Sequence, residues 1–207
     1  MLRKLGLFVL VACSMTGVAS AQVAMLTQVT GDVKVAGGDG SRSAVPFLKV
    51  NDGDTLTLVG GARVQMVYLS SGRQEIWNGA GPVKVGTAQS TSSLTPQASQ
   101  VPALILRQLE KTPAVGQHGK TGMVMLRSLD DLGAADQLEK DYKDYRAKAA
   151  PEDTTPEVFY LTGLLDIGET QTASKVLEEL KAKQASQPAY APVVEHFSRL
   201  VAEATKK

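Results

Sequence analysis

The chain has 207 residues, of which 43% are hydrophobic and 21% are charged, and its formal net charge is +1. This composition is typical of a globular protein and excludes global disorder, and the length suits one medium domain or two small ones. The near-neutral charge argues against nucleic acid or another polyanion as a partner.

The first 21 residues have the pattern of a cleavable export signal. Two basic residues near the start precede a short apolar run, and Ala19 and Ala21 fit the −3 and −1 positions of a signal peptidase site. We therefore expect cleavage between Ala21 and Gln22. No later segment reaches ~18 consecutive apolar residues, so the sequence predicts no transmembrane span after this cleavage.

Cys13 offers an alternative way of processing the signal. The run Leu10 to Cys13 resembles a bacterial lipobox, in which the cysteine is lipidated and becomes the first mature residue. Because Cys13 is the only cysteine, a chain that begins at Gln22 has no disulfide and no thiol nucleophile. The two cleavage sites thus predict either a soluble exported protein or one with a lipid anchor.

Residues 22–86 have the pattern of a small β domain. Short runs of alternating apolar and polar residues indicate strands with one buried face, and glycines separate these runs. The strands are expected in the segment 23–35, in the segment 48–77, and at Val83 and Val85. The connections expected between strands are Gly31-Asp32, the Gly-rich loop 37–43, Gly53-Asp54, Gly60-Gly61, Gly72 and the loop Asn78 to Pro82.

The order of these motifs resembles the FecR-type domain. That family has a G-x-V strand, a v-x-x-G-D-x-l strand entry, a g-x-a-x-l-x-l strand and a d-G-s turn. The resemblance implies an all-β fold and binding to proteins of the cell envelope. The family's signal transducers carry a cytoplasmic regulator and a transmembrane helix, whereas this chain has a cleavable signal instead. The matching segments here are Gly31 to Val33, Val50 to Leu56, Gly61 to Tyr68 and Ser70-Ser71-Gly72.

The Gly53-Asp54 pair is interpreted as a turn. Glycine takes a positive φ angle there, and the aspartate side chain bonds to nearby backbone N–H groups. Asp52 and Asp54 together suggest a calcium loop as the alternative. Leu56 and Leu58 occupy the positions where such a loop needs further oxygen ligands, so no metal site is predicted.

Two aromatic residues of this segment are candidates for ligand binding. If exposed, Trp77, the only tryptophan, and Tyr68 would form a platform for a carbohydrate. If buried, Trp77 is an ordinary core residue that closes the sheet, and this is the interpretation that we favour.

Residues 87–127 are predicted to be a linker that contains one helix, Val101 to Glu110, and a short apolar segment, Met123 to Arg127. Gly119-Lys120-Thr121 resembles the end of a phosphate-binding loop. However, Ala114 stands where the motif needs its first glycine, and Gly122 interrupts the helix that should follow. Nucleotide binding is therefore not expected.

Residues 128–207 are predicted to be α-helical, because apolar residues recur there at three-to-four spacing. The segment Glu157 to Lys183 resembles a tetratricopeptide-like helical hairpin, with Gly168 at the turn and Ala173 at a close-packing position. With about one and a half such units, the module is expected to lean on the β domain. The four helices are expected from Leu132 to Lys148 with Ser128 as N-cap, after Thr155-Pro156, after Thr170, and after Pro188 and Pro192.

The sequence contains no recognisable catalytic constellation. Its two histidines are His118, in a Gly-rich loop, and His196, which is expected at the surface or boundary of the last helix. Neither belongs to an H-E-x-x-H motif, and two histidines alone do not make a three-ligand zinc site. We therefore predict no catalytic residue, no cofactor and no metal.

The prediction as a whole is a segregated α+β protein. It comprises a signal peptide (1–21), a FecR-like β domain (22–86), the linker (87–127) and tetratricopeptide-like helices (128–207). We expect a non-enzymatic scaffold in the periplasm or at the outer membrane of a bacterium, with other envelope proteins as partners. The alternatives are a cell-wall or carbohydrate-binding module that uses Trp77 and Tyr68, and an envelope hydrolase.

Overall fold

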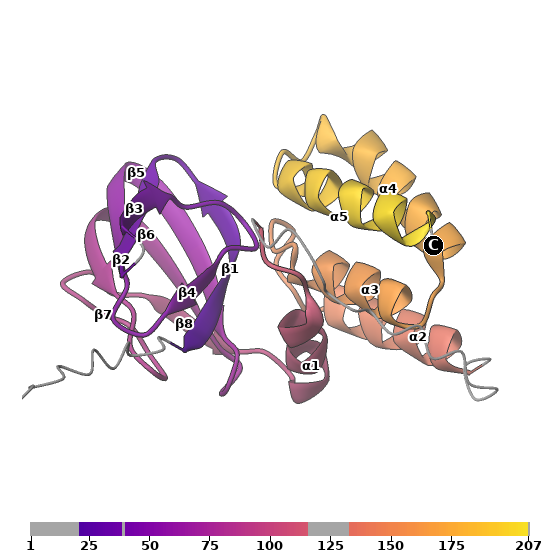
Figure 1. Ribbon diagram of the computed structural model, residues 1–207, viewed down its shortest axis with the longest axis horizontal. Coiled ribbons are helices and arrows are strands. Elements are labelled where there is room, and N and C mark those ends of the chain that lie inside the picture. The colour runs from indigo at the N-terminus through magenta and orange to yellow at the C-terminus, as the bar shows by residue number, and fades with distance from the viewer. Residues whose placement is uncertain (1–20, 39, 116–132, 207) are drawn as a thin grey trace, which may run out of the picture.

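The computed structural model describes residues 21–38, 40–115 and 133–206. They form two lobes (Figure 1): a β lobe of residues 21–100, and a helical lobe of residues 101–115 and 133–206. This is the segregated α+β architecture that the sequence predicts. In the part of the chain that is described, no helix is both long enough and apolar enough to span a membrane.

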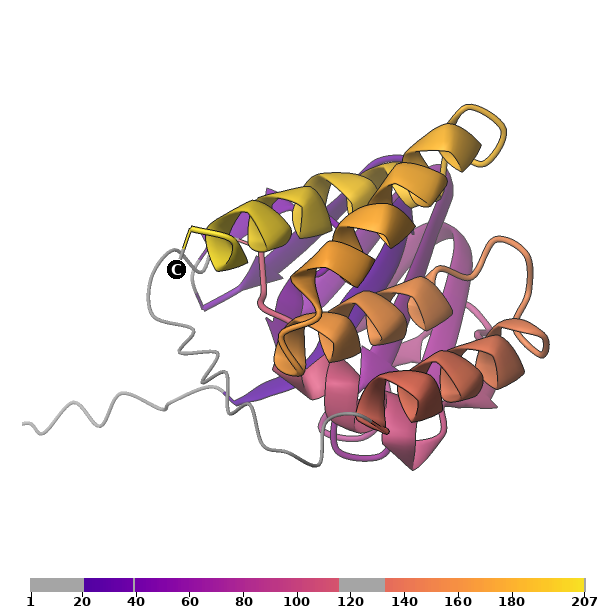
Figure 2. The ribbon, with the colours of Figure 1, turned by 90° about the vertical axis from the view of Figure 1, so that its right-hand side faces the viewer.

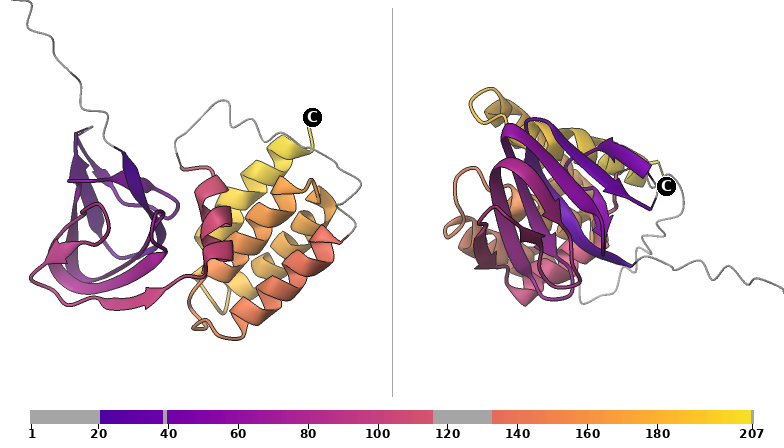
Figure 3. Two further views of the ribbon diagram at one scale, coloured as in Figure 1. Left: turned by 90° about the horizontal axis from the view of Figure 1, so that it is seen from below. Right: turned by 90° about the vertical axis from the view of Figure 1, so that its left-hand side faces the viewer.

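The β lobe is one antiparallel sheet of eight strands that curls into an open barrel (Figure 3). The long strand β5 organises it, because β5 pairs with β1 and β2 along one edge and with β6 along the other. The strands are β1 (Gln22–Thr30), β2 (Val33–Gly37), β3 (Gly40–Ser43), β4 (Lys49–Asn51), β5 (Thr55–Tyr68), β6 (Arg73–Lys84), β7 (Thr91–Ser92) and β8 (Gln97–Gln100).

The expected connections at Gly31 and Gly53 are confirmed, and both glycines have positive φ angles. The connection expected at Gly60-Gly61 is wrong: β5 continues through these residues, and its register with β6 shifts between Leu58 and Ala62. Glycines therefore mark a bulge inside one long strand rather than a turn between two.

Three further boundaries differ from the prediction. The Gly-rich loop expected at 37–43 contains the last residue of β2 and the whole of β3. The expected loop Asn78 to Pro82 lies inside β6, which continues to Lys84, so Val83 does not begin a new strand. The predicted linker supplies β7 and β8, which both pair with β6. These two strands are short and polar, and β8 is fully exposed, so they lack the apolar alternation that marks the others.

Burial on β5 changes along the strand because the helical lobe covers the outer face of its second half. Near its start, Leu56 and Leu58 are buried while Thr57 is exposed, which is the alternation of a strand with one solvent-exposed face. From Val64 to Tyr68 every residue is buried. Residues such as Met66 point into the β lobe core, whereas Val67 belongs to the core of the helical lobe.

The helices of the helical lobe lie side by side and cover one face of the curled sheet (Figure 2). Between α2 and α3 the approach is close, since a Cβ atom added at Gly163 would lie 2.6 Å from a methyl carbon of Leu138. Gly168 ends α3 with a φ angle of 79°, as its predicted role at the turn requires. The helices are α1 (Ala103–Lys111), α2 (Ala134–Arg146), α3 (Thr155–Asp166), α4 (Thr170–Gln184) and α5 (Tyr190–Ala204).

The predicted helices are confirmed with small shifts at their ends. Pro156 lies in the first turn of α3, but the helix begins at Thr155, one residue earlier than expected. Pro192 lies in the first turn of α5 rather than before it. Ser128, the N-cap expected for the first of these helices, lies outside the described residues.

Candidate functional site

The two aromatic residues proposed as a platform are both in the β lobe core. Trp77 is 1% exposed and Tyr68 is 0% exposed. The Trp77 ring N–H donates to Glu75 Oε2 at 3.2 Å, and the Tyr68 hydroxyl shares a hydrogen bond of 2.7 Å with Ser90. The core interpretation of Trp77 is thus confirmed. The platform alternative needed exposed rings, and the burial of both counts against it.

Glu75 is the centre of a buried polar cluster beside these rings. Its carboxylate is fully buried and accepts hydrogen bonds from Arg73 Nε at 2.7 Å and from the Ser90 backbone N–H at 3.3 Å, in addition to Trp77. A buried carboxylate needs such compensation, because an unpaired one is costly to remove from water. The cluster ties the segment that contains Ser90 to β5 and β6, and its polar atoms are occupied by structural bonds.

The Gly53-Asp54 turn is built as the sequence predicts. Asp54 is 4% exposed, and its Oδ2 accepts a hydrogen bond of 2.9 Å from the Asn51 backbone N–H. The turn is joined to the end of β6 by two backbone hydrogen bonds with Val85. A hollow beside Asp54, also lined by Val35 and Arg42, has a volume of about 10 Å³, which is room for one water molecule.

The seam between the lobes combines aromatic and polar contacts. Phe47, in the segment between β3 and β4, inserts its ring into the helical lobe and is 1% exposed. It stacks on His196 with ring centroids 4.6 Å apart and meets Phe197 edge-on at 6.0 Å. Its backbone has a φ angle of 65°, which is uncommon for a residue with a side chain. The packing of the ring compensates for that strained backbone.

A second contact across the seam is polar. Gln65 on β5 donates through Nε2 to Asp153 Oδ1 at 2.9 Å and to Thr155 Oγ1 at 3.2 Å. The same Asp153 oxygen accepts the backbone N–H of Thr155 at 2.9 Å and so supports the start of α3. Nearby, Arg63 pairs with Glu152 at 3.6 Å. The loop before α3 is thereby fastened to the sheet.

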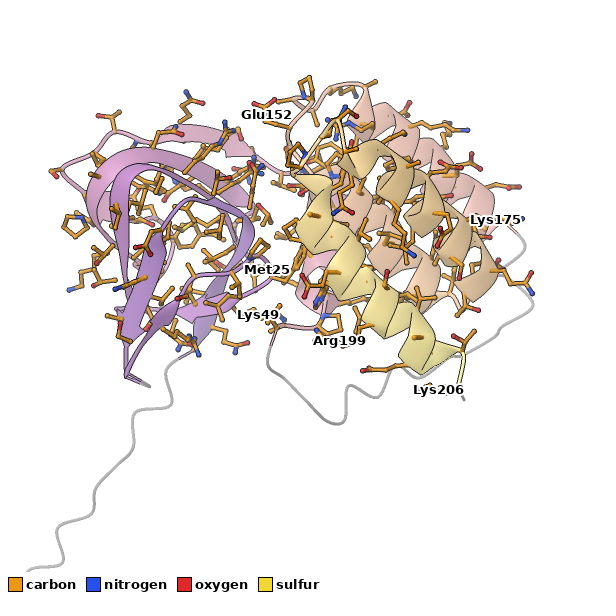
Figure 4. All side chains as sticks on the ribbon, turned by 90° about the horizontal axis from the view of Figure 1, so that it is seen from above. Met25, Lys49, Glu152, Lys175, Arg199 and Lys206 are labelled. Atoms are coloured by element: carbon orange, nitrogen blue, oxygen red, sulfur yellow. The ribbon has the colours of Figure 1, made fainter. Side chains whose placement is uncertain are left out.

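Lys49 makes a third contact across the seam, on the side where Arg199 also lies (Figure 4). Its Nζ donates to the backbone carbonyl of Glu110, the penultimate residue of α1, at 3.2 Å. Burial lowers the pKa of Lys49, and the negative charge of Glu110 acts in the opposite direction. Lys49 therefore ties β4 to the end of α1.

His196 is buried at this seam and is only 4% exposed, so it is not the surface residue that the sequence suggested. Its Nδ1 lies 3.3 Å from Arg199 Nη2, and its Nε2 has no hydrogen-bond partner of good geometry among the described residues. A signal for this burial existed in the sequence. His196 stands three residues after Val193, which places it on the apolar face of α5.

The helical lobe has its own buried ion pair. Arg146 Nη1 lies 3.1 Å from Glu157 Oε2, and the Glu157 side chain is 2% exposed. Burial raises the pKa of Glu157, and the positive charge of Arg146 opposes that shift. The Tyr142 hydroxyl donates to the same carboxylate at 3.3 Å, and burial raises the pKa of Tyr142 above its ordinary value. These groups join α2 to α3 and leave no free nucleophile or base at the pair.

Several residues discussed from the sequence lie outside the described residues: Cys13, Ser128, His118, the Gly119-Lys120-Thr121 segment and the apolar run Met123 to Arg127. Of the predicted cleavage site, Ala21 is exposed and Gln22 is the first residue of β1. Within the residues that are described, no group of three histidine, cysteine, aspartate or glutamate side chains is placed to hold a metal ion.

Comparison with known proteins gives no match: no family model, no curated protein and no solved structure matches this chain.

Proposed function

We propose that this protein is a non-enzymatic scaffold of the bacterial cell envelope, which binds other envelope proteins. The observation that carries the proposal is the continuous core across the seam, where Met25, Phe47 and Val67 of the β lobe pack with residues of the helices. Such a core fixes the orientation of the two lobes, which is what a scaffold needs in order to hold partners in a defined arrangement. The buried carboxylates of Asp54, Glu75 and Glu157 are engaged in structural bonds, which is also what a scaffold requires.

The proposed family of the β lobe is the FecR type. The motif segments coincide with elements of the sheet: Gly31 to Val33 leads into β2, Gly53-Asp54 joins β4 to β5, and Gly72 precedes β6. The proposed counterpart of the helical lobe is the tetratricopeptide repeat. In support, α3 and α4 are joined at Gly168, and the small residue Ala173 is fully buried against its neighbours.

Export is the second part of the proposal. The first strand begins at Gln22, so cleavage after Ala21 would leave the whole described sheet in the mature chain. The alternative cut at Cys13 would add a lipid anchor to the same fold. The mass of the mature protein distinguishes these products, because a diacylated Cys13 at the N-terminus excludes a soluble form.

The decisive experiment is crosslinking in intact cells, followed by recovery of the tagged full chain and identification of the partners by mass spectrometry. The proposal expects a small, reproducible set of envelope proteins. A matched control is the Phe47→Ala variant, which keeps the surface but loosens the seam and should recover less of the same partners. If no envelope protein is recovered, and the purified chain binds cell-wall glycan instead, the proposal fails.

A further inference from the structure

The contact between Phe47 and His196 joins the two lobes through a titratable ring. We propose that His196 is an acid-sensitive latch, whose protonation releases Phe47 and separates the β lobe from the helical lobe. This property is independent of the scaffold function, because it concerns how the lobes hold each other and not what they bind.

The geometry requires a neutral His196 ring when the lobes are joined. Arginine can only donate hydrogen bonds, so the contact of Arg199 Nη2 with Nδ1 needs Nδ1 to be the unprotonated nitrogen. The single proton of the ring is then on Nε2. A second proton would have to go to Nδ1, where it removes the hydrogen bond and places two cations 3.3 Å apart.

The surroundings of His196 offer little compensation for a positive charge, because only the Pro113 backbone favours the charged ring. One face of the ring is covered by Phe47 and its edge by Phe197, and 4% of the residue is exposed. Phe47 thus keeps water from the ring, and a charged group that loses its hydration is strongly disfavoured. Opening the seam would return both the ring and its charge to solvent.

Among the charged groups on the elements around the ring, Arg199 disfavours protonation. Arg199 is on α5 itself, and Lys49 is on β4, with its Nζ on the carbonyl of Glu110 at the end of α1. Figure 4 shows Lys49 and Arg199 on the two sides of the seam. No carboxylate in the described part of the chain forms a hydrogen bond or ion pair with His196, so the nearest charged contact is the Arg199 cation.

The sign of the pH dependence follows from the pKa of the closed state. Burial, and to a lesser extent the positive charge of Arg199, lower the pKa of His196 to about 4, although the Pro113 backbone acts in the opposite direction. An exposed histidine has a pKa of ~6.5, so the open state binds the proton more tightly than the closed one. Acid therefore favours opening. The opening equilibrium should rise about 25-fold between pH 7.5 and pH 5, and more than ~100-fold by pH 4.

The test follows the distance between the lobes in the full chain. Spin labels are attached at Thr57→Cys on β5 and Lys175→Cys on α4, both exposed, with Cys13→Ser to remove the only native thiol. The label distance is measured against urea at pH 7.5 and at pH 5, together with Trp77 fluorescence for the β lobe. At pH 5 we expect the two lobes to separate at a lower urea concentration than the one at which the β lobe unfolds. The opening equilibrium at pH 5 should be about 25-fold larger than at pH 7.5.

The chain contains its own matched control, because it has only two histidines. The His118→Asn variant should keep the full pH response. The His196→Asn variant has an amide oxygen that accepts from Arg199 but does not titrate, and its response should fall below ~3-fold. If His196→Asn retains the full response, the latch is excluded.

A second variant keeps the test decisive if His196→Asn does not fold. Arg199→Gln removes the neighbouring cation and so should weaken the pH response, because protonation in the closed state then costs less. An unchanged or stronger response in Arg199→Gln would overturn the proposal. So would a label distance and a Trp77 signal that change together at both pH values, because His196 would then stabilise the whole fold and not the seam.

Discussion

The two lobes complete their cores in different ways. The β lobe core consists only of residues from its own strands and turns, from Ala24 to Val85. The helical lobe core also includes Met25, Phe47 and Val67 from the β lobe. The sheet curls and so encloses its own interior, whereas the helices form a layer that has one face to cover. We conclude that the helical lobe depends on the β lobe more than the reverse.

The largest effect on this asymmetry is expected from Phe47→Ala. Removing a fully buried aromatic ring costs roughly 3–5 kcal/mol. Because the ring belongs to the helical lobe core, the loss should appear in the helix signal of far-UV circular dichroism during urea unfolding. The stability of the β lobe, which is monitored by Trp77 fluorescence, should decrease much less. Equal losses in both signals would contradict the asymmetry. Val45→Ala, two residues away and 38% exposed, is the matched control.

A smaller effect is expected from the polar side of the seam. Asp153→Ala removes the acceptor for Gln65 and for the Thr155 backbone N–H, and leaves buried donors unsatisfied. The expected loss in unfolding free energy is about 1–3 kcal/mol, again mainly in the helical lobe. Glu152→Ala is the comparison, because its pair with Arg63 is partly exposed and contributes under ~1 kcal/mol. Similar losses in the two variants would argue that the loop is not fastened through Asp153.

Packing inside the helical lobe gives the third prediction. Gly163→Ala places a Cβ atom 2.6 Å from a Leu138 methyl carbon, which costs roughly 1–3 kcal/mol through overpacking. The better helix propensity of alanine offsets about 1 kcal/mol of this cost. Thermal unfolding should therefore show a net loss of stability in Gly163→Ala. Adding Leu138→Val to the same chain should partly restore that stability. A stabilised Gly163→Ala variant would show that the helices have room to move apart.

The smallest effect is expected on the outer helix surface. Lys143→Ala breaks an ion pair with Glu139 one turn away, in which both side chains are largely exposed. Such a pair contributes about 0.2–0.5 kcal/mol and is screened by salt. The free energy of urea unfolding should barely change, and the change should be smaller still in high salt. A loss above ~1 kcal/mol would mean that this face of α2 is covered by something other than solvent.

The sequence indicates the local elements of both lobes well. Strands with one wet face show an alternating pattern, as at Leu56, Thr57 and Leu58, and turns such as Gly53-Asp54 depend on neighbouring residues only. The same holds for the α3–α4 turn, where Gly168 is required by its positive φ angle. These features follow from short-range sterics and burial, which a single sequence carries.

The features that depend on distant partners are not visible in the sequence. Gly60-Gly61 is a bulge instead of a turn because β6 continues opposite it, and β8 is a strand only because β6 offers it an edge. Gln65 and His196 are polar residues at buried positions, and their burial depends on the other lobe. Only the apolar spacing of α5 hinted at the position of His196.

The contact between Phe47 and His196 also has a consequence for the order of folding. The two residues are about 150 positions apart, whereas the strand and helix pairs within each lobe join segments that lie much closer in the chain. Closing so long a loop is slow, so each lobe's local structure should form before the lobes dock. Changes at Phe47 should then mainly accelerate undocking and leave the early folding rate unchanged. During synthesis, Phe47 therefore remains without its aromatic partners until α5, the last helix, has been made.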